Sequence, residues 1–324
     1  MLIRVKAIVL TLLFLLAAIL WFWSLDLRPQ SFNDYRLQST LVKGNNFPKT
    51  LVDASGQEFI LHMAPQRLVS VTLATDEILS ELVGEQRVVG ITHLADDPKI
   101  SNIPHQYSKH IKRINSDIEA ILALQPDLVF VTRYTRAETV RLLFAAGIAV
   151  VRLSGDSSFK EIKDNIVTIG RVTGTEDRAG KLLQKLQADR EAITAKIKGQ
   201  PSVRVLFYSL NGYTAGVGTT VDEVIGVAGG INVAQEAALT GSQKISEELA
   251  IGLQADVILL NDFATQGKIT PAEQLMQNPN WQHVPAVANK RVYGLQGRWP
   301  ISDSQYSWQG IKEVATLLHT NVFE

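Results

Sequence analysis

The sequence has no cysteine among its 324 residues. Disulfide bonds, thiolate metal sites and a cysteine nucleophile are therefore excluded. The lipid-modified cysteine that anchors many bacterial surface proteins is excluded as well. Any attachment to a membrane has to be made by the peptide itself.

The sequence also has no excess of charge of either sign, because 32 Lys and Arg balance 32 Asp and Glu. A neutral chain has no global positive field for nucleic-acid phosphates, so no nucleic-acid partner is expected. With 46% hydrophobic residues the chain can bury a substantial core. Its length predicts about two domains.

An export signal is visible at the start of the chain. Arg4 and Lys6 precede an apolar run over residues 7–23 that only Thr11 interrupts. Such a run is about 25 Å long as a helix, near the lower limit for spanning a bilayer. No small-residue cleavage site follows clearly, so we expect residues 1–30 to form an uncleaved signal-anchor rather than a removed signal peptide. Either reading places the rest of the chain in the periplasm or another extracytoplasmic space.

After a polar linker over residues 31–46, strand and helix patterns alternate. A hairpin at residues 50–61 comes first. The later runs predict two α/β lobes, 47–174 and 200–324, with mainly parallel central sheets. The predicted strands are 68–71, 88–91, 128–131, 150–153, 203–208, 257–260 and 291–293. The predicted helices are 76–84, 117–124, 136–146, 159–171, 220–228, 247–253, 271–277 and 305–319.

One long helix is expected between the lobes, over residues 175–199. The segment has no proline, a single internal glycine at Gly180, and apolar residues at helical spacing. Such a helix would be about 36 Å long. A rigid helical connection predicts that the lobes open by small angles only, unlike lobes joined by a Gly-rich hinge.

A weak internal repeat links the two lobes. Residues 117–129 align with residues 246–258, so a capping residue, a helix, a turn with Leu-Gln-x-Asp and a strand recur after 129 residues. Any αβ unit shares part of this pattern.

An ordered set of short motifs resembles the periplasmic binding proteins for ferric siderophores, cobalamin and haem. The motifs are Phe47-Pro48, Pro65-Gln66-Arg67-Leu68-Val69-Ser70, Glu119 to Val129, Thr214-Ala215-Gly216, Ala228-Gly229-Gly230 and Pro279-x-Trp281 with Arg291-Val292-Tyr293. The resemblance implies two lobes bridged by a helix, a ligand between them, and docking on an ABC permease dimer with its ATPase. The chain departs from the family at Thr72-Leu73-Ala74, where Ser-Pro-Ser or Ser-Pro-Asn is frequent.

The candidate ligand contacts lie where predicted strands end, because parallel sheets bind ligands beyond the carboxyl ends of their strands. Aromatic faces offer flat apolar contact, and guanidinium groups offer forked donors for ligand oxygens. The predicted ligand-binding residues are His93, Arg133, Tyr134, Tyr213, Arg298 and Trp299.

No catalytic, cofactor or metal site is predicted. Gly216–Thr220 lacks the lysine of a phosphate loop, and Asp96-Asp97-Pro98 is good turn chemistry. The six histidines, His62, His93, His105, His110, His283 and His319, show no metal-ligand spacing. Iron or cobalt would be present only inside a bound ligand.

Two glutamates are candidates for permease docking. Glu119 and Glu248 lie in the first turns of the two repeated helices, and the resemblance matches them to acidic residues that contact the permease. The helix dipole alone also favours acidic residues there. The predicted function is thus capture of a ferric siderophore or corrinoid-like chelate for an ABC importer. A two-lobed chelatase-like enzyme and a membrane-tethered sensor that has lost transport remain the alternatives.

Overall fold

The computed structural model describes residues 39–52, 57–115, 117–132, 135–154, 158–261, 269–295 and 298–323. By its contacts the chain divides into residues 1–37 and residues 38–324, and the described residues all belong to the second unit. The expected signal-anchor, residues 1–30, lies outside the described residues. Among the helices that are described, none is long and apolar enough to cross a bilayer.

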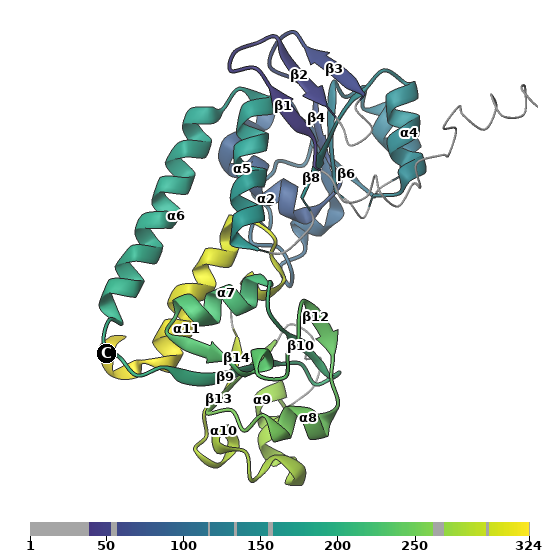
Figure 1. Ribbon diagram of the computed structural model, residues 1–324. Coiled ribbons are helices and arrows are strands. Elements are labelled where there is room, and N and C mark those ends of the chain that lie inside the picture. The colour runs from purple at the N-terminus through teal and green to yellow at the C-terminus, as the bar shows by residue number, and fades with distance from the viewer. Residues whose placement is uncertain are drawn as a thin grey trace, which may run out of the picture. The chain divides into compact units, whose positions relative to one another are not determined.

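The N-terminal lobe is built on a five-stranded sheet with the order β6-β5-β4-β7-β8, parallel throughout (Figure 1). Its strands are β4 (Leu68–Ser70), β5 (Val88–Thr92), β6 (Lys112–Ile114), β7 (Leu128–Thr132) and β8 (Ala149–Leu153). The sequence predicted four of these. It missed β6, because a three-residue edge strand with two cations gives no hydrophobic pattern.

Helices cover both faces of this sheet (Figure 1). They are α2 (Leu73–Leu82), α3 (Ile118–Ala123), α4 (Ala137–Ala145) and α5 (Phe159–Thr173). All five residues of β7 are buried. Leu128 and Phe130 belong to the cluster that includes α2 and α5, whereas Val129 and Val131 belong to the cluster of α3 and α4. Burial on both faces explains why this strand is a continuous apolar run.

A small antiparallel sheet, β1-β2-β3, precedes the lobe. The predicted hairpin corresponds to β2 (Lys49–Val52) and β3 (Glu58–Leu61), but β1 (Leu41–Lys43) corrects the sequence analysis, which placed residues 31–46 in a linker. Leu41 is exposed and only Val42 is buried, so a single inward side chain holds this edge strand. One buried residue is too weak a pattern to recognise in sequence.

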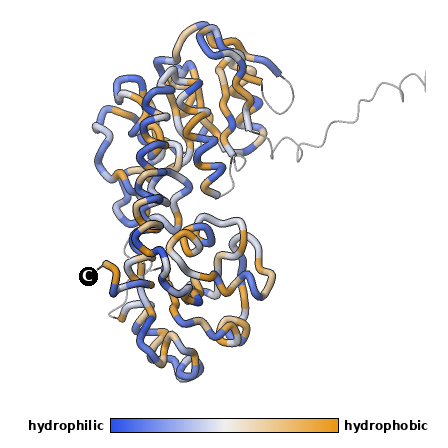
Figure 2. The backbone as a smooth tube through the Cα atoms, turned by 60° about the vertical axis from the view of Figure 1, so that its left-hand side comes forward, coloured by the Kyte–Doolittle hydropathy of each residue, from blue (hydrophilic) through white to orange (hydrophobic). Residues whose placement is uncertain are grey.

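The segment between the lobes contains α6 (Glu176–Lys196), a single helix of 21 residues. It starts after Gly174, whose φ of 70° ends α5 in the left-handed region that favours glycine. In Figure 2 hydrophobic and hydrophilic residues alternate along the helical turns, as expected for helices with one buried face.

The C-terminal lobe has a four-stranded parallel sheet with the order β11-β9-β13-β14. Its strands are β9 (Val203–Tyr208), β11 (Gly230–Asn232), β13 (Val257–Asn261) and β14 (Val292–Leu295), and β10 (Tyr213–Ala215) pairs separately with β12 (Ser242–Lys244). Its helices are α7 (Thr220–Val227), α8 (Glu247–Gly252), α9 (Pro271–Gln277), α10 (Pro285–Ala288), α11 (Gln309–Leu318) and α12 (Thr320–Phe323). The two sheets confirm the predicted α/β class.

The internal repeat is also seen in matching hydrogen bonds and backbone angles of the two lobes. Arg67, just before β4, donates from Nη2 to the Leu124 carbonyl at 2.6 Å, and Arg204, near the start of β9, donates from Nη2 to the Leu253 carbonyl at 2.9 Å. The turn glutamines also agree, with φ of 47° at Gln125 and 46° at Gln254. The two lobes therefore repeat one αβ unit with the same guanidinium contact at its helix end.

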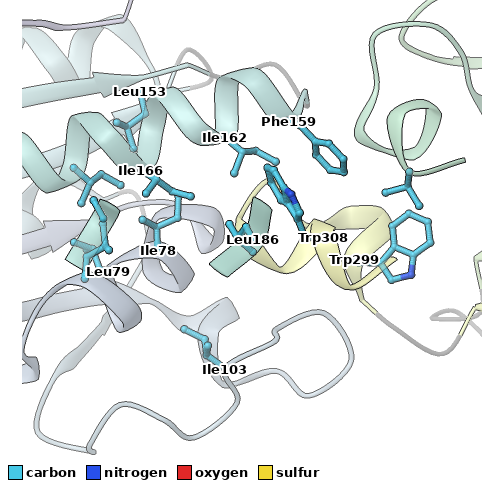
Figure 3. Packing of buried hydrophobic residues seen from close by; sticks show 14 of the residues in the cluster. Ile78, Leu79, Ile103, Leu153, Phe159, Ile162, Ile166, Leu186, Trp299 and Trp308 are labelled. Carbon is cyan, nitrogen blue, oxygen red and sulfur yellow. The ribbon is translucent and has the colours of Figure 1, made fainter. Parts of the chain in front are cut away.

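A continuous apolar core joins the two lobes beside α5, α6 and α11. The Phe159 ring of α5 stacks on the Trp308 indole from η7 (Gln305–Trp308) with centroids 4.0 Å apart (Figure 3). The Phe159 amide donates to Glu223 on α7 at 2.8 Å. Because Ile162, Leu186 and Trp308 lie in this same cluster, the lobes share buried surface, which fits small-angle opening.

Candidate ligand-binding site

The strand order reverses once in each sheet, and these switch points are where open α/β sheets bind ligands. In the N-terminal lobe the chain first adds β5 and β6 on one side of β4 and then adds β7 and β8 on the other side, so the switch point lies between β4 and β7. In the C-terminal lobe the corresponding reversal lies between β9 and β13. The residues at the carboxyl ends are Thr72 and Thr132 in one lobe and Tyr208 and Asn261 in the other.

A pocket of about 190 Å³ lies at the N-terminal switch point. Residues after β4, β7 and β8 form most of its wall, and a segment after β14 closes it. Its described lining is Thr72, Leu73, Ala74, Thr75, Glu77, Ile78, Thr132, Leu153, Ser154, Asn165, Ile301, Ser302 and Asp303. Hydroxyl and amide groups dominate the polar part, and no basic residue belongs to this described lining.

Two local motifs position the pocket's polar groups. Thr72 caps α2, and its hydroxyl lies 2.9 Å from that of Thr75. Asn165 sits in the buried face of α5, where its Oδ1 accepts from the Ser154 amide at 2.9 Å and its Nδ2 donates to the Ser154 carbonyl at 3.0 Å. The sequence analysis noted Thr72 only as part of a departure from the family motif, and it missed Asn165. The available signal was a polar residue interrupting an otherwise apolar helix face.

Glu77 ties the closing segment to the N-terminal lobe. Its carboxylate is fully buried. Oε1 accepts from the backbone amide and the side-chain amide of Asn102, both at 2.9 Å. Oε2 accepts from the hydroxyls of Ser302, at 2.9 Å, and Ser304. Four donors compensate the buried charge, and they fix the segment that forms one wall of the pocket.

Its neighbour Asp76 is also fully buried but has fewer partners. Oδ2 accepts from the Thr92 hydroxyl at 2.6 Å and from the Thr92 amide at 3.1 Å, whereas Oδ1 has no partner among the described residues. Burial raises the pKa of Asp76 to about 8, against the lowering effect of the Thr92 hydroxyl. Asp76 is therefore largely protonated at neutral pH.

The structure spreads the predicted ligand-binding residues widely. Arg133 and Tyr134 lie outside the described residues. His93 is the exposed first residue of η3 (His93–Asp96), and Tyr213, at the start of β10, is 45% exposed. Neither belongs to the described lining of the pocket. Arg298 is half-buried, and its Nε donates to the Pro98 carbonyl, 200 residues away in sequence.

Trp299 requires a correction, because its side chain is a core residue and not an open aromatic face. It is 1% exposed, and its indole Nε1 donates to Glu313 at 2.7 Å. The ring lies against Gly310, where an added Cβ would come within 2.3 Å of Trp299 Cδ2. A tryptophan at a strand end fits a ligand platform and a core position equally well, so sequence could not separate the two.

At the C-terminal switch point, Asn261 has an unused acceptor. Its Oδ1 is buried and has no hydrogen-bond partner within the described part of the chain. Tyr208 beside it is buried and lies 5.2 Å from Trp281, ring centroid to ring centroid. Tyr208 thus belongs to the core, whereas Asn261 offers a polar group with an unused acceptor at this switch point.

The two predicted docking residues are exposed at equivalent places. Glu119 follows the capping residue Asp117, and Glu248 follows the capping residue Ser246. The pKa of Glu248 is lowered by hydrogen bonds, first from its own backbone amide and then from the Ser246 hydroxyl. Its neighbour Glu247 differs, because it accepts from Trp281 Nε1 at 2.7 Å and from Asn278.

A family model described as periplasmic binding protein matches residues 68–298, which contain the parallel sheets of both lobes and all of the pocket lining except Ile301, Ser302 and Asp303. The chain belongs to this family. The prediction made from the ordered motifs is thereby confirmed. In this periplasmic binding protein the matched region begins at β4, so β1, β2 and β3 precede it.

Curated relatives and solved structures agree with this assignment. The chain is 26% identical over 293 residues to YvrC of Bacillus subtilis, an uncharacterised ABC transporter substrate-binding lipoprotein, covering 86% of this chain and 88% of the relative. It is 28% identical over 257 residues to a cobalamin-binding protein of Halobacterium salinarum, covering 77% and 68%. The crystal structure of the periplasmic haem-binding protein HutB of Vibrio cholerae matches with a TM-score of 0.65 at 27% identity, covering 78% and 99%.

Proposed function

We propose that the chain captures a bulky organic ligand, a ferric siderophore, a corrinoid or a haem, beyond the carboxyl ends of its two parallel sheets. Its family and its similarity to YvrC over most of both chains make it the substrate-binding component of an ABC importer. The observation that carries the ligand proposal is the pocket at the N-terminal switch point, closed by residues from after β14.

The chemistry of the pocket suits the uncharged, oxygen-rich edge of such a ligand. Hydroxyl groups and the Asn165 amide can donate and accept, and no cation is available in the described lining. Carboxylates of the ligand would be bound by Arg133 and Arg298, with Tyr134, Tyr213 and His93 as further contacts. A volume of about 190 Å³ holds only part of a large chelate, so the proposed site extends beyond this pocket.

The relatives support this ligand class, since one of them binds cobalamin and a solved neighbour binds haem. The decisive experiment is native mass spectrometry, with an absorption spectrum, of the protein purified from its own host. A bound haem, corrinoid or ferric chelate would support the proposal. Titration with cobalamin, haem and a ferric catecholate should then show binding of one class. A protein that binds none of them, but binds a small sugar or amino acid, would contradict it.

We also propose that the protein catalyses no reaction. Among the described residues no cluster of three or more His, Asp or Glu could hold a metal ion. The pocket's one buried carboxylate, Glu77, is fully engaged by four donors and has no paired histidine in the described lining. A chelatase would insert metal into a free macrocycle, so incubation with protoporphyrin and ferrous iron tests this alternative. Formation of haem above the spontaneous rate would overturn our proposal.

The proposed cellular arrangement is a protein tethered to the inner membrane and docked on a permease dimer. The tether is residues 1–30, supported by the basic flank, the apolar run and the absence of the cysteine that a lipoprotein requires. Fractionation of the native host tests it. Mature protein that starts near residue 25 and is released without detergent would exclude the tether. Glu119 and Glu248, exposed on equivalent helices, are the proposed permease contacts.

A further inference from the structure

A groove of about 900 Å³ lies between α6 and the C-terminal helical segment, away from the strand ends of both sheets. One wall is a face of α6 that runs from Arg178 to Lys196, and the other includes Tyr306, Trp308 and Lys312. The helical rise from Arg178 to Lys196 is about 27 Å. The groove is therefore elongated along the helix axis.

The α6 wall has an apolar row and a basic row. At about 100° per residue, Lys181, Lys185, Arg178 and Lys196 fall within about 60° of the helix circumference. All four are exposed. Leu182, Leu186 and Ile193 form the adjacent row, half-buried or buried against the body of the protein. The groove thus has an apolar floor and a cationic rim.

The opposite wall repeats this combination. Tyr306 and Phe323 are half-buried and supply aromatic surface to this wall, and Trp308 beside them is buried and stacked on Phe159. Exposed Lys312 adds a fifth cation to the rim. The carboxylates in the described lining are Glu81 and Asp189. Among the described lining residues, five cations against two carboxylates leave a positive excess, in a chain whose net charge is zero.

The charges of these cations are not neutralised by ion pairs inside the described part of the molecule. No ion pair with a described acidic residue is formed by Arg178, Lys181, Lys185, Lys196 or Lys312. Lys196 lies 4.2 Å above the Phe323 ring, and Arg178 donates to the Leu82 carbonyl. Neither contact neutralises charge. A row of free cations beside an apolar floor is complementary to a partner with the opposite arrangement.

We infer that this groove docks an acidic amphipathic helix of a partner protein. The length of about five turns suits a helix in a groove, read through anchors at i, i+3, i+4 and i+7. Acidic residues on one side of such a helix would meet Lys181 and Lys185, and apolar residues would cover Leu182 and Ile193. A flat anionic membrane would meet the exposed cationic rim but would not enter the groove, so the apolar floor and the aromatic wall would stay uncovered. A membrane partner therefore explains only half of the surface.

The test uses the full chain and a fluorescent 18-residue helical peptide with one Glu row beside one Leu row. Anisotropy should give a dissociation constant in the micromolar range that weakens as salt is raised. Lys181→Glu with Lys185→Glu should weaken binding at least tenfold. Ile193→Asp should also weaken it, because the apolar floor is lost. The matched control is Lys99→Glu with Lys109→Glu, which changes the net charge equally on exposed residues outside the groove and should leave binding unchanged.

Two further measurements separate the alternatives. A peptide of the same composition, with its Glu residues distributed around the helix, should bind at least tenfold more weakly. Equal binding of both peptides, or equal loss in the control variant, would mean unspecific attraction and would overturn the inference. Vesicles with 30% phosphatidylglycerol test the membrane. If the Lys181→Glu, Lys185→Glu protein loses vesicle binding while no peptide binds the native groove, the surface is a lipid contact and the proposed docking is wrong.

Discussion

Glu77 and Ser302, 225 residues apart in sequence, share a buried hydrogen bond of 2.9 Å that holds the segment after the last strand of the C-terminal sheet against the first helix of the N-terminal lobe. Gln305 adds a bond from its Nε2 to the Glu77 carbonyl at 2.7 Å. One glutamate thus organises both a lobe contact and a pocket wall. Glu81, one turn later on the same helix, is exposed and provides a natural control.

The first prediction is that Glu77→Ala lowers the free energy of unfolding by about 3 kcal/mol, because the Asn102, Ser302 and Ser304 donors lose their acceptor in a buried site. Glu77→Gln should cost about 1 kcal/mol, since its carbonyl can still accept and the serine hydroxyls can rotate. Glu81→Ala should change stability by less than about 0.5 kcal/mol. Urea denaturation of the three variants measures these changes in the free energy of unfolding. Equal stability of Glu77→Ala and Glu81→Ala would show that the buried network contributes nothing.

The second prediction concerns pH. The folded protein holds the proton of Asp76 up to about pH 8, whereas the unfolded chain releases it near pH 3.8. The stability from this group is therefore fully present below about pH 3.8 and is lost as the pH rises towards 8. Asp76→Asn should remove this pH dependence. The melting temperature of the variant should therefore rise relative to that of the native protein as the pH is raised from 5 to 9. Thermal scans across that range test it, and parallel pH profiles of the two proteins would refute the raised pKa.

The third prediction fills the proposed ligand pocket. Ala74 lines it and is half-buried at the start of the first helix of the N-terminal lobe. Ala74→Trp should occupy much of the volume and weaken ligand binding at least tenfold, because the ligand can no longer reach the switch point. Ala192→Trp, an exposed substitution on α6, should leave affinity unchanged. Calorimetric titration with the ligand identified from the host compares the affinities of the two variants. Normal affinity in Ala74→Trp would place the ligand elsewhere.

The fourth prediction tests the proposed charged contacts. Loss of a guanidinium that binds a ligand carboxylate should cost about 1.5–3 kcal/mol, or about tenfold to a hundredfold in affinity. Arg133→Ala and Arg298→Ala are the two variants. Arg298→Lys separates charge from geometry, because lysine keeps the charge but loses the forked donors. Arg141→Ala, an exposed arginine paired with Glu138, is the control. Unchanged affinity in both alanine variants would remove the charged half of the site.

The fifth prediction is that Glu119→Arg with Glu248→Arg abolishes transport and permease binding while ligand affinity stays normal. Both carboxylates are exposed, and reversing them turns attraction to basic permease residues into repulsion. Asp177→Arg with Glu191→Arg changes the same number of charges on exposed positions of α6 and should transport normally. Uptake assays and pull-down with the permease give the two readouts. Normal uptake in the Glu119, Glu248 variant would leave these residues as helix-dipole partners only.

The sequence alone determined the features that depend on local pattern and on order along the chain. Continuous apolar runs such as residues 128–131 and 257–260 specify strands buried on both faces, and the helical spacing over residues 175–199 specifies α6. The repeat of residues 117–129 at 246–258 determined that the lobes share a unit, and the structure extends it to the paired contacts of Arg67 and Arg204. The absence of cysteine by itself excludes disulfides and thiolate metal sites.

Which strand-end residues meet depends on how distant segments pack. Glu77 and Glu81 are the same residue type one turn apart, yet one is buried among four donors and the other is exposed. Trp299 fills the core against Gly310, whereas Ser302, three residues later, reaches the pocket. Local pattern cannot separate such cases, because burial depends on tertiary packing: Glu77 meets Ser302, 225 residues away, and Trp299 packs on Gly310 of a later helix.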